Sequence, residues 1–492
     1  MHDSIGKRIL KAVVLTFDRL PAHLLGCYGN EWTETPGFDR LASLGSVFDQ
    51  HFAEVPGPVG PNHSWWTGRF EFFRDSGAEK RGDGGSDQNW LQRLNDLGVK
   101  CRLLAENTEG LPTELFYSSE ALGGVTGLNA QHDDVPIARL IQRGIEILGG
   151  DGSEATGSDE DSPTELLWLH SQGVPSPWLP PRLFAELYLD ELEEIVDGES
   201  GSEIASDLVG QFENDPDLVR LLLSDWRREV VSDDDSADVD PEAASSVAEA
   251  ESDDIDSPEL ERQISRLVFA GYVSMIDRWL LKLLEAVETS DEKILLVVSA
   301  NQGHSFGEIV DLVPNAVGSA ASTVGNSDRA SDRFQPGSLS DSDVRTPLII
   351  AEFSRTADGH SFGSRHTALV QPVDVAATLD MWLGDVSEES SHDSATVGQS
   401  QLEALQGGTP ESRPAAFCLG SDGQLGVRSC NWSLVTSAEA MHDEDLVHSD
   451  VRLFAKPDDQ WDVHDVSSQY GEEVDALLAE LRTRIAARSD PE

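Results

Sequence analysis

The segment KAVVLTF, residues 11–17, decides how the rest of the chain is interpreted. It is a continuous apolar run of β-forming residues, which is the pattern of a strand buried on both faces. Strands of this kind occur mainly in parallel sheets that helices cover on both sides. The run ends at Asp18, and functional sites of α/β proteins usually lie at the carboxyl ends of such strands.

The remaining regular elements alternate along the chain. Further buried strands are predicted at residues 100–105, 165–171, 293–300 and 346–353. Helical patterns are found at residues 34–45, 134–149, 182–196 and 262–287. This alternation predicts an α/β domain in which helices cover both faces of a mostly parallel sheet.

The last part of the sequence has a different character. From about residue 411 the segments are short and β-like, and one final helix is predicted at residues 472–488. We therefore expect an α/β domain at 1–410 and a small antiparallel β subdomain with a terminal helix at 411–492. Stretches rich in Ser, Asp, Gly and Ala are predicted to be acidic, flexible surface insertions. They are residues 149–163, 232–259, 315–343 and 385–401.

Composition excludes several classes of partner. The 492 residues include 35 basic and 90 acidic ones, a net charge of −55, so the field of the protein repels nucleic acid and anionic membranes. No apolar run approaches the length of a membrane span, and the N-terminus lacks the features of a signal peptide, so a cytoplasmic location is predicted. The four cysteines form no CxxC pair, which argues against a zinc site.

The order of motifs in residues 13–70 resembles the N-terminal block of the sulfatase family. A buried strand ends in Asp18, and GCYG, TPGFDRLASLG, a Phe-containing strand and TGRF follow at close spacing. Residues 271–308, 345–353, 366–384 and 453–485 resemble later family segments, so the resemblance covers nearly the whole chain apart from the insertions. It implies an alkaline-phosphatase-like α/β sandwich with a smaller C-terminal β subdomain.

The resemblance also implies a chemistry, namely hydrolysis of sulfate esters by a formylglycine made from Cys or Ser, with a divalent cation, usually calcium, bound to oxygen ligands. At the nucleophile position this sequence has Pro58, with no hydroxyl or thiol within five residues on either side. Formylglycine therefore cannot form there.

The implied metal site is also altered. Asp18 matches the first metal-binding carboxylate, but Asn301 and Gln302 stand where the family has an Asp-His pair. One carboxylate and two amides carry little charge, so calcium binding is expected to be weak or lost. The alternatives are that Asp18 caps a turn or pairs with Arg19, and that Asn301 and Gln302 form a turn after the strand.

Several other side chains are candidates for a site. His63, His304 and His366 could build a new hydrolytic centre with a metal-bound water, and Arg365 or His366 lies near a basic position of the family. His170 stands in the segment where the family places a substrate loop. Trp65 and Trp66 are interpreted as core residues of a helix rather than as a binding platform.

Three functions remain open at this point. The first is a sulfatase-like protein that is non-catalytic or strongly divergent and binds a sulfated or phosphorylated small molecule. The second is a metal-dependent hydrolase of sulfate, phosphate or phosphonate esters that uses metal-bound water. The third is a protein-interaction scaffold with a closed pocket. Convergence of Asp18, His63, Asn301, His304 and His366 would favour the second.

Overall fold

The structure of the protein is a computed structural model. The described residues are 10–56, 63–70, 89–127, 129–149, 165–174, 180–185, 187–188, 258–304, 339–354, 363–384, 396–420, 423–438 and 450–489. Pro58, Pro175 to Pro177 and most of the four expected insertions lie outside these residues.

An eight-stranded sheet forms the centre of the protein, in the order β4-β3-β5-β1-β6-β7-β2-β8. Only β7 runs against its two neighbours, and every other pairing is parallel. This confirms the mostly parallel sheet expected from the sequence. The strands are β1 (Leu10–Arg19), β2 (Ser46–His51), β3 (Lys100–Ala105), β4 (Ser118–Ala121), β5 (Glu165–Gly173), β6 (Lys293–Gln302), β7 (Leu348–Phe353) and β8 (Ser364–Val370).

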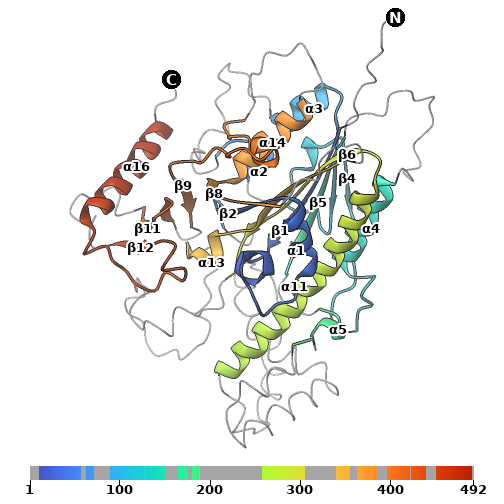
Figure 1. Ribbon diagram of the computed structural model, residues 1–492, viewed down its shortest axis with the longest axis horizontal. Helices are drawn as coiled ribbons and strands as arrows, with labels where there is room; N and C mark the ends of the chain where they lie inside the picture. The colour runs from blue at the N-terminus through green and yellow to red at the C-terminus, as the bar shows by residue number, and fades with distance from the viewer. Residues whose placement is uncertain are drawn as a thin grey trace, which may run out of the picture.

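Helices cover both faces of the sheet (Figure 1). One face packs on α1 (Pro36–Leu44), α4 (Pro136–Leu148) and α11 (Pro258–Thr289), and the other on α2 (His63–Thr67), α3 (Trp90–Asp96) and α14 (Pro372–Gly384). Alternate residues of β1 enter the two cores, because successive side chains of a strand point to opposite faces. Val13 and Leu15 face α11, whereas Ala12 and Val14 face α14. The strand is therefore apolar throughout.

Trp65 and Trp66 lie in the second of these cores, as expected for a helix that buries its aromatic residues. Both indoles are almost fully buried, and the ring of Trp66 lies 4.3 Å from that of Trp168 on β5.

Short helical segments complete this part of the chain. They are η1 (Ala22–Leu24), η2 (Gly26–Tyr28), η4 (Thr113–Leu115), α5 (Arg182–Ala185), α13 (Asp341–Val344) and α15 (Leu402–Leu405).

The C-terminal part forms a separate antiparallel sheet, in the order β12-β11-β10-β9, with a terminal helix beside it (Figure 1). Its elements are β9 (Ala416–Leu419), β10 (Gln424–Arg428), β11 (Trp432–Ser437), β12 (Val451–Ala455) and α16 (Gly471–Ser489). The apolar side of α16 packs on this sheet through Val474, Leu478 and Leu481. The predicted subdomain and helix are thus confirmed as elements.

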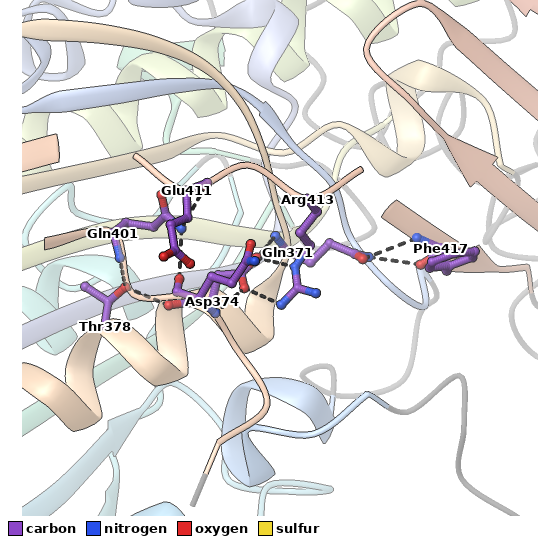
Figure 2. Close-up of polar contacts among 8 residues, drawn as sticks. Gln371, Asp374, Thr378, Gln401, Glu411, Arg413 and Phe417 are labelled. Atoms are coloured by element: carbon purple, nitrogen blue, oxygen red, sulfur yellow. Dashed lines mark hydrogen bonds and ion pairs between the residues drawn. The ribbon is translucent and has the colours of Figure 1, made fainter. Parts of the chain in front are cut away.

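A buried polar clamp joins the two parts (Figure 2). Asp374 on α14 is fully buried and accepts hydrogen bonds from Nε and Nη2 of Arg413, the first at 2.7 Å. The side chain of Gln371 bonds both backbone groups of Phe417 on β9, at 2.9 and 3.2 Å. The segment that leads into the second sheet is therefore held on α14 by charge and by hydrogen bonds.

The ends of two expected insertions lie among the described residues and pack against the fold. Residues 396–401 lie against α14, and the backbone N–H of buried Gln401 donates to Thr378 Oγ1 at 2.9 Å. Residues 339–343 lead into and form part of α13, where Asp341 is only 5% exposed. The polar composition of both stretches suggested surface loops. Gln401 and Asp341 are nevertheless buried, and specific hydrogen bonds and ion pairs compensate their polar groups.

Candidate functional site

Four adjacent parallel strands, β3, β5, β1 and β6, end at the same edge of the sheet. Their carboxyl ends bring together polar groups from distant parts of the sequence: Glu106 follows β3, His170 lies on β5, Asp18 on β1 and Asn301 on β6. In open α/β sheets this is the edge at which ligands usually bind. We describe the four residues and their partners as the strand-end cluster.

Asp18 and His170 form the centre of the strand-end cluster. Asp18 Oδ1 lies 3.2 Å from His170 Nε2, and His170 Nδ1 lies 3.0 Å from Thr16 Oγ1. Trp168 donates its indole N–H to the same hydroxyl at 2.8 Å. A carboxylate can only accept, so Nε2 carries a proton and donates it to Asp18.

Asn301 gives Asp18 a second donor. Its amide nitrogen donates to the same Oδ1 at 3.0 Å. Burial acts to raise the pKa of Asp18, but the charge and hydrogen bond of His170, the hydrogen bond of Asn301 and the charge of Arg19 together lower it. Asp18 is therefore held as a carboxylate by nitrogen donors.

Glu106 is a part of the cluster that the sequence analysis did not single out. Its Oε1 accepts the Ser171 hydroxyl at 2.7 Å, and its Oε2 accepts the backbone N–H of Gln172 at 3.0 Å. Burial raises its pKa to about 7, although these hydrogen bonds and His170 act in the opposite direction. Its position directly after the predicted strand 100–105 was a signal that could have identified it.

The turn expected at Asn301 and Gln302 does not form. Both residues belong to β6, and the carbonyl of Gln302 accepts the backbone N–H of Leu20 at 3.0 Å. His304 lies just beyond the strand, buried, with its ring stacked 5.0 Å from that of Phe269 on α11. Burial first, then the charges of Arg19 and His23, hold its pKa well below the usual value.

The structure does not bring Arg365 and His366 to this edge. Both lie near the beginning of β8, where Ser364 pairs with Ser46, the first residue of the parallel strand β2. β8 is the edge strand of the sheet, and β7 and β2 separate it from β6. Arg365 pairs with Asp49, and His366 Nε2 lies 2.8 Å from the Ser364 hydroxyl.

His63 is the first residue of α2, which packs on α14 and α3. Pro58, at the position where the family resemblance places the nucleophile, lies outside the described residues. Of the site residues expected from the sequence, Asn301 and His170 both contact Asp18.

The strand-end cluster does not fit a calcium ion. Calcium is bound by six to eight oxygen ligands, several of them carboxylates. Here Oδ1 of Asp18 already accepts two nitrogen donors, and Asn301 presents its amide nitrogen rather than its oxygen to Asp18. Within the described residues, no group of three or more His, Cys, Asp or Glu side chains is placed to hold a metal ion.

Comparison with known proteins identifies the fold. No family model matches the chain, and no curated protein matches its sequence. Three solved structures of similar architecture are described here. A protein solved in complex with its substrate D-glucosamine-2-N,6-O-disulfate is 16% identical with a TM-score of 0.62, and the match covers 98% of each chain.

The second is a phosphonate monoester hydrolase of Agrobacterium radiobacter, 15% identical with a TM-score of 0.58, where the match covers 97% of this chain and 96% of the other. The third is a 2-O GAG sulfatase, 13% identical with a TM-score of 0.58, covering 99% and 93%. The chain therefore has the fold of sulfatases and phosphonate monoester hydrolases, the alkaline-phosphatase-like α/β fold.

Among the described helices, none is both long and apolar enough to cross a membrane.

Proposed function

We propose that this chain is a sulfatase-fold protein that binds a sulfated or phosphorylated small molecule without hydrolysing it. The observation that supports the proposal is the set of hydrogen-bond donors around Asp18. Its Oδ1 accepts His170 and Asn301, so nitrogen donors stand where an oxygen-coordinated cation would need ligands. Pro58 has no side-chain group that can attack sulfur or phosphorus.

The proposed ligand class rests on the structural relatives. One of them is described with a disulfated glucosamine as its substrate, and another is a phosphonate monoester hydrolase. Tetrahedral oxyanions of this kind have three or more strong acceptor oxygens, and Arg side chains recognise them well. A protein with this fold can retain recognition of the anion after its reactive groups have changed.

Turnover assays test the proposal directly. Purified protein is incubated with p-nitrophenyl sulfate, p-nitrophenyl phosphate and a phosphonate monoester, with calcium, manganese, zinc or EDTA. We expect no release of product above that of the Asp18→Ala variant, and no change of melting temperature with calcium.

The opposite result would favour the metal-dependent hydrolase. Metal-stimulated turnover that Asp18→Ala abolishes would contradict the proposal. If the protein neither hydrolyses esters nor binds sulfated or phosphorylated ligands, the interaction scaffold with a closed pocket becomes the better hypothesis.

A further inference from the structure

A shallow hollow lies beyond the carboxyl ends of the strands, between the α/β part and the C-terminal part of the chain. Its polar lining comes from three segments: His23 of η1, Ser342 and Arg345 in and after α13, and Gln460 and Trp461 after β12. The rings of His23 and Trp461 meet edge to face across it, at 5.5 Å. The hollow is therefore built by both parts of the protein.

Arg345 supplies the positive charge of this hollow. Its Nε donates to the backbone carbonyl of Asp49 at 2.9 Å, which fixes the base of the guanidinium group. Throughout the described part of the chain, no carboxylate forms an ion pair with Arg345. A guanidinium that is held at one edge leaves its terminal N–H groups to bind a planar or tetrahedral anion.

The one carboxylate in the lining is already neutralised. Asp341 Oδ1 lies 3.4 Å from the guanidinium of Arg428 and 3.6 Å from Lys456 Nζ, and Lys456 also pairs with Asp462 at 2.7 Å. Two cations and two carboxylates thus compensate one another beside the hollow. The charge of Arg345 is not part of this balance.

The surroundings of His23 show the same excess of positive charge. Burial first, and then the charges of Arg266 and Arg345, lower the pKa of His23 to about 4, against the smaller opposing effect of Asp341. The imidazole is therefore neutral at pH 7 and still provides an N–H donor. At His23 the charges of Arg266 and Arg345 thus outweigh that of Asp341.

We propose that this hollow binds the sulfate or phosphate group of the ligand, with the guanidinium of Arg345 as the anchoring charge and with Gln460 and Trp461 on its C-terminal side. The inference rests on the proposed function and gives its ligand a place. It differs from the strand-end cluster, in which a carboxylate is the central group. An anion bound here would contact both parts of the protein and stabilise their junction.

Calorimetric titration of the full chain with inorganic sulfate and inorganic phosphate, at constant ionic strength, tests the site. We expect both anions to bind, and Arg345→Gln to weaken binding by about tenfold or more, because a charge-assisted contact is lost. Gln460→Glu places a negative charge on the other side of the hollow and is expected to weaken binding similarly. Arg139→Gln, which removes a positive charge from an exposed side chain of α4, is the matched control and should leave affinity unchanged.

The two variants separate loss of the site from loss of the fold, because the side chain of exposed Gln460 can change without disturbing the Arg345 contact to Asp49. Sulfate and phosphate affinities that are unchanged in both variants would overturn this location while leaving the proposed function intact. Absence of binding by the wild-type protein would overturn both. Ester turnover dependent on Asp18 would contradict the proposed function alone.

Discussion

Asp18 Oδ1 lies 3.2 Å from Nε2 of His170, across the parallel pair β1 and β5, and this contact joins the two central strand ends. Removal of the Asp18 side chain leaves the His170 imidazole without its partner, and removal of His170 does the same to the Asp18 carboxylate. In a double-mutant cycle with Asp18→Ala and His170→Ala, we expect a coupling energy of about 1–3 kcal/mol at pH 7. Urea unfolding of the four proteins measures it.

The coupling should also depend on pH. The folded protein lowers the pKa of Asp18, so the stabilisation is present above the unfolded value of about 4 and is lost as the pH falls through the lower folded value. Additive effects of the two substitutions at pH 7 would show that the contact contributes nothing.

The raised pKa of Glu106 predicts the opposite dependence of stability on pH. Its folded pKa is about 7, whereas an unfolded glutamate titrates near 4.3. Between these values the unfolded chain loses the proton and the folded chain keeps it, so stability falls as the pH rises, by about 3 kcal/mol over the interval. Glu106→Gln should remove this slope, which unfolding titrations from pH 5 to 7 measure.

The exposed residue Glu114 provides the control for this experiment. Glu114→Gln should leave the slope of the wild-type protein in place. A slope that persists in Glu106→Gln would assign the titration to another group.

The clamp between Asp374 and Arg413 predicts a large loss of stability. Removing one member of a buried ion pair leaves an uncompensated charge, which costs about 3–5 kcal/mol. Asp374→Ala and Arg413→Ala should each lower the free energy of unfolding by this amount in chemical denaturation. Arg139→Ala, which breaks an exposed pair with Asp134, should cost less than about 1 kcal/mol. Equal effects at the two sites would contradict the assigned role of the clamp.

Asp277 of α11 caps the beginning of α1 from outside that helix. Its two carboxylate oxygens accept the backbone N–H groups of Gly37 and Phe38, at 2.9 and 2.8 Å. Loss of a capping side chain costs about 0.5–2 kcal/mol. Asp277→Ala should therefore lower the melting temperature, and Asp277→Asn, which keeps one accepting oxygen, should lower it less.

The sequence by itself determined the layers of this protein. The strand 11–17 is apolar on both sides because both of its faces are buried, and this pattern is readable without coordinates. The same holds for 100–105, which forms β3 with the predicted bounds, and for the helix at 34–45, where Pro36 begins the helix and Gly45 follows its last residue. Burial and local backbone preference leave a periodic signal in the chain.

Only the tertiary structure decided what lies around Asp18. His170, Asn301 and Glu106 are 88 to 283 residues away in sequence and meet Asp18 because of the strand order β3-β5-β1-β6. The same order places His366 on the edge strand β8, which β7 and β2 separate from β6, although its residue type alone made it an equal candidate. Electrostatics and hydrogen bonding act over a few ångströms in space, so the pKa of Glu106 and the lack of a carboxylate partner for Arg345 among the described residues follow from packing rather than from local sequence.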